Sequence, residues 1–224
     1  MKLKKLLLPV LCVALPVGLC ACVSAGSNTI SPTQKSNDIF EKKLDEYATM
    51  LAKVALNVQQ GQTILIECNV ENHYFANKVI DKCYEAGAAD VVMNWVDDYS
   101  KHEKIENAST ETLENLPSYA NAIKNGYVGN GASALKIESE LPDENEGLDA
   151  SKISAYSKAR KATLKDSSAM TSDNSVVWVV AAVPNVPWAE KVFPKLKGDE
   201  AVSALWDKIF ESVRVYGDGK VLDN

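Results

Sequence analysis

Residues 63–96 have the sequence TILIECNVENHYFANKVIDKCYEAGAADVVMNWV, which predicts a strand, a helix and a second strand. The first six residues, Thr63–Cys68, form a short β-branched apolar run typical of a buried strand. Apolar residues then recur at helical spacing over Phe75–Ala86, and Gly87 stands where a C-terminal helix cap is expected. The second strand is expected at Ala89–Val96. This order predicts a right-handed crossover between two parallel strands.

The same alternation continues in both directions along the chain. Apolar spacing predicts a helix over Asp38–Leu56, with Asp38 as its N-terminal cap. Further strands are expected at Ala132–Ile137 and Val176–Val183, and the latter is almost wholly apolar, as expected when helices cover both faces. Other helical stretches are Tyr99–Lys124, Ala150–Lys165 and Glu200–Val215. We therefore expect an α/β fold, a three-layer sandwich with a mainly parallel sheet of about four strands.

Composition narrows the classes of function. The chain has 224 residues, of which 46% are hydrophobic, enough for the core of one ordinary domain. Its 24 Lys and Arg residues against 30 Asp and Glu give a formal charge of -6. Basic residues interleaved with aromatics are not found, so nucleic acid is not expected as a partner. The glycine-containing stretch Gly126–Gly131 precedes a strand instead of opening a helix, which predicts a turn and not a phosphate-binding loop.

The amino terminus has the features of an export signal. Three lysines in the first five residues precede a short apolar run, Leu6–Leu19, which two prolines interrupt. This run is too short and too broken to span a bilayer comfortably. It ends in Leu19-Cys20-Ala21-Cys22, which resembles a bacterial lipobox, so we expect residues 1–22 to be a signal peptide and Cys22 to carry a lipid. Ordinary cleavage after Val23-Ser24-Ala25 is the alternative. Either route exports the protein, and a membrane-anchored lipoprotein is favoured over a freely secreted protein.

Residues 23–36 are rich in Ser, Thr, Asn, Gln and Pro and predict a flexible tether, which leaves residues 37–224 as the α/β domain. Two of the five cysteines, Cys68 and Cys83, lie in that domain. They lack CxxC spacing and a histidine partner pattern, so a zinc site is not indicated. A disulfide remains an alternative, but two separate small core residues are favoured.

Candidate catalytic residues are few. His73 follows the first strand, at the carboxyl end where α/β sheets bind ligands, and His102 lies in a charged helix. Neither belongs to an HExxH motif, and both are expected to be surface histidines. Asp97 and Asp98 end the second strand and could orient a substrate amine or share a proton, but helix capping is favoured because adjacent side chains point different ways. The residues alone assign no catalytic, cofactor-binding or metal-binding group.

Six blocks of sequence, in a fixed order and spacing, resemble one family. They are Phe40–Leu44 with Tyr47-Ala48, Asn57–Gln62, Tyr84–Ala88, Trp95–Asp98, Pro187–Pro194 and Leu205–Phe210. Together they are similar to the thermophilic-type metalloaminopeptidases, the relatives of aminopeptidase T and aminopeptidase S. The resemblance covers nearly all of residues 38–215, and Pro187–Pro194 is its most specific block.

This resemblance implies an enzyme about twice as long and usually dimeric, which removes amino-terminal residues from peptides. Its two divalent metal ions would be held by the carboxyl-terminal half, so no metal ligand is expected in this chain. This chain would be the amino-terminal domain, inactive alone, and would meet peptides when a second half completes the enzyme. The alternative is an exported, noncatalytic binding or dimerisation module. An exposed apolar patch is expected first near Trp188 and Phe193, although core packing is favoured for both.

Overall fold

The computed structural model describes the backbone of residues 32–222 and the side chains of residues 36–222, so the predicted signal peptide and Cys22 lie outside the described residues. Four strands form one sheet: β1 Thr63–Asn69, β2 Asp90–Val96, β3 Ser133–Glu138 and β4 Trp178–Ala182. Their order is β2-β1-β3-β4, and every pair is parallel. The predicted parallel α/β sheet is confirmed.

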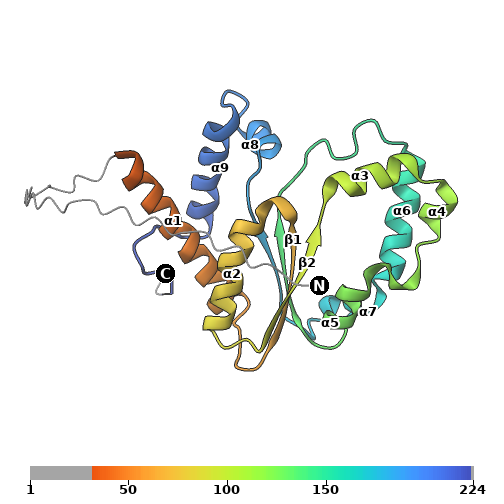
Figure 1. Cartoon of the computed structure of the whole chain (residues 1–224), viewed down its shortest axis with the longest axis horizontal. Coiled ribbons are helices and arrows are strands. Elements are labelled where there is room, and N and C mark those ends of the chain that lie inside the picture. The colour runs from red at the N-terminus through yellow and green to blue at the C-terminus, as the bar shows by residue number, and fades with distance from the viewer. Residues whose placement is uncertain (1–31, 223–224) are drawn as a thin grey trace, which may run out of the picture.

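Helices cover both faces of this sheet (Figure 1). Those of the described residues are α1 Pro32–Met50, α2 His73–Glu85, α3 Asp98–Asn107, α4 Thr110–Glu114, α5 Ala122–Val128, α6 Ala150–Thr163, α7 Lys165–Ser172, α8 Val186–Val192 and α9 Gly198–Ser212. One layer contains α1, α2, α8 and α9, and the other contains α3 to α7 (Figure 1). The predicted three-layer arrangement is therefore confirmed. None of the helices in the described part of the chain is both long and apolar enough to cross a bilayer.

The connections between strands change direction at the centre of the sheet. Helix α2 links β1 to β2 on one face, whereas α3 to α5 link β2 to β3 on the opposite face (Figure 1). Strands β1 and β3 are neighbours at the centre of the sheet. The chain places β2 on the outer side of β1 and β4 on the outer side of β3. In parallel α/β sheets, such a switch point opens a crevice at the carboxyl ends of the strands.

The main core lies between the sheet and the layer of α1, α2 and α9, and aromatic side chains fill it. The rings of Tyr47 and Phe75 stack at 5.1 Å, and those of Trp206 and Phe210 stack at 5.0 Å. Burial of such large rings supplies much of the stability of a small domain. These aromatic residues come from α1, α2 and α9, so the same core joins the two ends of the described chain.

Both cysteines of the domain are buried free thiols, as expected for small core residues. Burial raises the pKa of Cys68 to about 12 and that of Cys83 to about 11. Both thiols therefore stay protonated near neutral pH, which makes them poor nucleophiles and poor metal ligands. The sequence prediction of two separate core residues is confirmed.

Several helix boundaries differ from the sequence prediction. Helix α1 begins at Pro32, so Asp38 lies inside it as an exposed residue, and its prediction as the cap was wrong. Proline is well tolerated in the first turn of a helix, where its missing N–H has no partner to lose. Residues 32–36, the last part of the predicted tether, are therefore helical. Helix α8 was not predicted; Asn185 caps it by accepting from the Trp188 N–H at 2.8 Å.

Strand β4 is covered on one face only, so the prediction that helices cover both of its faces was wrong. It forms an edge of the sheet, and Trp178 and Val180 are 51% and 54% exposed on the face that leads away from the main core. The opposite face carries the buried Ala181. Trp188 and Phe193 pack against the main core, as favoured from the sequence. Strand β4 is therefore one of the places where large apolar side chains are exposed.

Candidate functional site

A cleft of about 740 Å³ opens where β1, β2 and β3 end. Its walls are the strand ends and two helices of the second layer, α3 and α6, and residues such as Asn69, Val96 and Glu138 mark the ends of the three strands. The cleft lies at the switch point between β1 and β3, where sheets of this topology bind ligands. Its volume is that of a small-molecule or short-peptide site.

A buried carboxylate forms part of the floor of this cleft. Glu67 on β1 is 6% exposed. Its Oε2 accepts a hydrogen bond of 3.1 Å from Nδ2 of Asn94, and the Lys124 ammonium lies 3.4 Å from both carboxylate oxygens. Because a buried carboxylate is costly unless it has partners, the contacts with Asn94 and Lys124 stabilise Glu67 and hold it in a fixed position.

Sequence reasoning missed this group, although a signal was present. Glu67 interrupts an otherwise apolar strand, and the register places it beside Asn94 of β2 and Lys136 of β3. One polar residue thus stands at the same level in each of three neighbouring strands. Their alignment depends on strand order and register, which the sequence did not supply.

Asp97 and Asp98 have separate roles, as the sequence prediction favoured. Asp97 caps α3 and accepts hydrogen bonds from the N–H groups of Tyr99 at 3.1 Å and Ser100 at 3.3 Å. The Ser100 hydroxyl, followed by these backbone groups, lowers the pKa of Asp97 below its usual value. Asp98 instead accepts from the Asn69 side chain, and both residues line the cleft. Burial raises the pKa of Asp98, and the Lys101 ammonium partly offsets that effect.

Charges of both signs line the rest of the cleft. Lys101 on α3 pairs with Glu144 at 2.7 Å, and Lys136 pairs with Glu138 at the end of β3. The ammonium of Lys104 lies 5.5 Å from the centre of the Tyr156 ring on α6. Such a surface can bind and orient a ligand that carries both charges and hydrogen-bonding groups. A nucleophile paired with a general base is not found among the described residues that line it.

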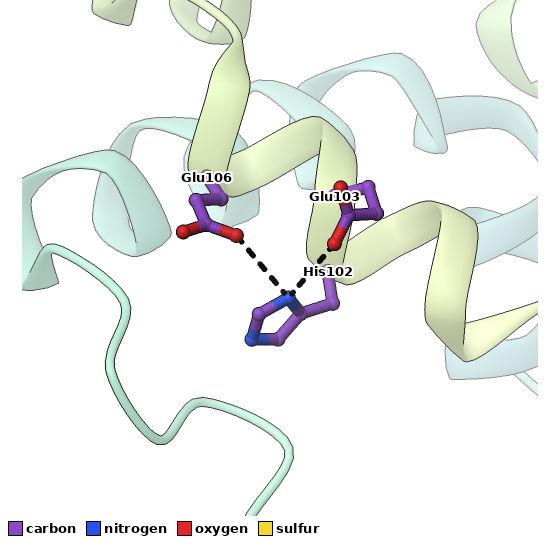
Figure 2. A group of neighbouring side chains, drawn as sticks. All are labelled: His102, Glu103 and Glu106. Carbon is purple, nitrogen blue, oxygen red and sulfur yellow. Dashed lines mark ion pairs between the residues drawn. The ribbon is translucent and has the colours of Figure 1, made fainter.

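The two histidines lie outside the wall of the cleft. His73 is exposed at the start of α2, with Nδ1 3.2 Å from the carbonyl oxygen of Val70. His102 lies on α3 beside Glu103 and Glu106 (Figure 2). Neither side chain is buried, which agrees with the prediction of surface histidines.

Comparison with known proteins assigns the chain to a family. Residues 40–222 match the model of the peptidase M29 family, described as thermophilic metalloprotease. The chain belongs to this family. The M29 match includes every strand of the sheet and the elements that form the cleft. The resemblance drawn from the sequence blocks is thus confirmed.

Aminopeptidases are among the M29 relatives. Aminopeptidase PepS of Streptococcus thermophilus is 36% identical over 79% of this chain and 43% of its own length. Aminopeptidase AmpS of Bacillus subtilis is 33% identical over 82% of this chain and 45% of its own. The structure of wild-type AmpT from Thermus thermophilus matches with a TM-score of 0.73 and 25% identity, over 79% of this chain and 44% of that one. This chain thus spans less than half the length of these relatives.

A metalloprotease family implies a metal centre, and the described residues do not fit the dinuclear one that the resemblance implies. Within residues 36–222, His102, Glu103 and Glu106 are the one group of three close donor side chains, and all three come from the single helix α3. Two ions about 3.5–4 Å apart require more ligands than this, including groups that bridge both ions. No step of peptide hydrolysis is therefore assigned to these residues.

Proposed function

We propose that this chain is the amino-terminal domain of a metal-dependent aminopeptidase and that hydrolysis takes place only with a carboxyl-terminal region that carries two divalent ions. The observation that supports this most strongly is the M29 match over residues 40–222, together with relatives named as aminopeptidases. Removal of amino-terminal residues from peptides is the reaction that those names describe.

The role of this domain within such an enzyme is to bind and orient the peptide. The cleft supports this role because its fixed charges match a peptide, which carries a terminal charge and a row of backbone N–H and C=O groups. Glu67 and Asp98 can attract an amine, whereas Lys101 and Lys104 can attract a carboxylate. Catalysis gains when a substrate is held in one orientation beside the reacting groups.

Two measurements test this proposal. The purified chain should release no amino acid from peptide amides, with or without added Zn²⁺, Co²⁺ or Mn²⁺, and sustained turnover would overturn the division of roles. In NMR titrations with a tripeptide at millimolar concentration, we expect the amide signals of Asn94, Lys101 and Ser139 to shift. Shifts confined to surfaces away from the cleft would contradict its role in peptide binding.

We also propose that the protein is exported and held at the membrane through a lipid on Cys22. The supports for this are the lysines before the apolar run Leu6–Leu19 and the lipobox-like end of that run. A homodimer is proposed as well, in keeping with the resemblance to dimeric enzymes. Its test is the molar mass of the chain by light scattering.

A further inference from the structure

The side chains of His102, Glu103 and Glu106 gather on α3 and turn polar atoms toward one another (Figure 2). Nδ1 of His102 lies 4.0 Å from Oε1 of Glu103 and 4.0 Å from Oε2 of Glu106. Residues 102 and 106 are four apart, so the helix places them on the same face. The role proposed for the cleft uses none of these three side chains.

Three lysines that lie beside this cluster in sequence or in space have other partners. Lys101 pairs with Glu144, and Lys104 lies over the ring of Tyr156. Lys152 donates to the backbone carbonyl of Glu106 at 2.6 Å, not to its carboxylate. Among the described residues, the carboxylates of Glu103 and Glu106 therefore have His102 as their one ion-pair partner. Two carboxylates with so little compensating charge attract a cation.

Asn107 holds Glu103 in the orientation that faces the imidazole. Its Nδ2 donates to Oε2 of Glu103 at 3.2 Å and to the backbone carbonyl of the same residue at 2.9 Å. The other carboxylate oxygen, Oε1, is the one that lies toward His102. A hydrogen bond of this kind orients a metal ligand and strengthens metal binding.

We propose that His102, Glu103 and Glu106 bind one divalent transition-metal ion, such as Zn²⁺. One imidazole and two carboxylates form a donor set that suits such ions, whereas Mg²⁺ prefers oxygen ligands alone. The three donor atoms lie within 4.8 Å of one another. Around a tetrahedral zinc ion, ligand atoms are about 3.4 Å apart, so flexible side chains close the site by moving roughly 1 Å.

Solvent can reach this site. The side chains of His102, Glu103 and Glu106 are 35%, 43% and 57% exposed. An ion can therefore enter directly from solution, and water can fill its remaining coordination positions. His102 also borders a hollow of about 380 Å³ between α3 and the loop that contains Pro142 and Leu148. This binding does not depend on the proposed aminopeptidase activity.

Isothermal titration of Zn²⁺ into the full chain tests the proposal. The chain is purified without a histidine tag, stripped with a chelator and treated to alkylate accessible thiols. We expect about one equivalent of Zn²⁺ to bind with a dissociation constant below about 1 mM, and excess Mg²⁺ not to displace it. His102→Ala should weaken binding at least tenfold, and Glu106→Gln should weaken it by a smaller factor.

His73→Ala is the matched control, because His73 is the other histidine of the chain and lies on α2. It should leave the affinity unchanged. Circular dichroism verifies that each variant is folded. Equal affinities for the unchanged chain and His102→Ala would overturn the proposal. Binding weaker than about 1 mM, or binding that Glu103→Gln and Glu106→Gln both leave unchanged, would also overturn it.

Discussion

The hydroxyl of Tyr47 on α1 and the backbone of Ala182 on β4 form two hydrogen bonds across 135 residues of chain. The hydroxyl donates to the Ala182 carbonyl at 3.3 Å and accepts from the Ala182 N–H at 3.1 Å. Burial raises the pKa of Tyr47 to about 12. Strand β4 is at the edge of the sheet, so this contact fixes its end against the first helix and the aromatic core.

Replacing Tyr47 with Phe should lower the free energy of unfolding by about 1–3 kcal/mol, because the ring still packs while the Ala182 N–H loses its partner. Urea unfolding followed by circular dichroism measures this difference. Tyr119→Phe is the control, since Tyr119 is 74% exposed and its change should be within about 0.5 kcal/mol of zero. Equal stability of the Tyr47→Phe variant and the unchanged protein would show that the two hydrogen bonds contribute nothing.

Lys124→Met should destabilise the domain by about 2 kcal/mol or more, because the buried Glu67 side chain then loses its cationic partner. Glu67→Gln removes the carboxylate, so the double variant should regain part of the loss. A double-mutant cycle in urea measures the coupling between the two residues. If the two single changes simply add, the pair is not coupled and the description of the cleft floor is wrong.

Asp97→Ala should destabilise α3 near neutral pH and have less effect in acid. The pKa of Asp97 is lowered in the folded protein, so its stabilising effect is present above the ordinary value of 3.8 and is lost as pH falls through the folded pKa. Thermal unfolding at pH 7 and below pH 3.8 should therefore give a larger difference between variant and unchanged protein at pH 7. Asp97→Asn, which keeps a capping side chain without a charge, is the matched variant. A difference that does not change with pH would contradict this account.

Cys22→Ala should abolish retention of the protein by membranes, because the proposed lipid attachment atom is lost. Cell fractionation after a high-salt wash measures retention. Cys20→Ala is the matched control, since it removes a neighbouring cysteine but leaves Cys22, and it should stay with the membrane. Retention of the Cys22→Ala variant would refute a lipid anchor at this residue.

Much of the fold could be predicted because local patterns agree with the final packing. The apolar run of β1 and the helical spacing of α2 match the structure closely, and Gly87 adopts the positive φ of 107° expected at a C-terminal cap. Strand β4 shows the limit of this reasoning. An apolar run indicates a strand, but whether helices cover both of its faces depends on strand order and on where α7 lies.

The candidate site was harder to predict because its parts come from separate segments. Glu67, Asn94 and Lys124 meet through sheet register and the position of α5, neither of which follows from spacing along the chain. Asp97 as a cap depends only on residues up to three positions away, and that prediction was confirmed. Local roles could thus be inferred from the sequence, whereas the shared site required the structure.

The most direct test of the central claim is a hybrid enzyme. Residues 37–222 of this chain replace the corresponding region of the Bacillus subtilis relative AmpS, and the hybrid is assayed on amino-acid p-nitroanilides beside this chain alone. The account predicts that the hybrid releases p-nitroaniline in a metal-dependent reaction and that the chain alone releases none. A folded, metal-loaded hybrid without activity, or equal activity of the chain alone, would contradict it.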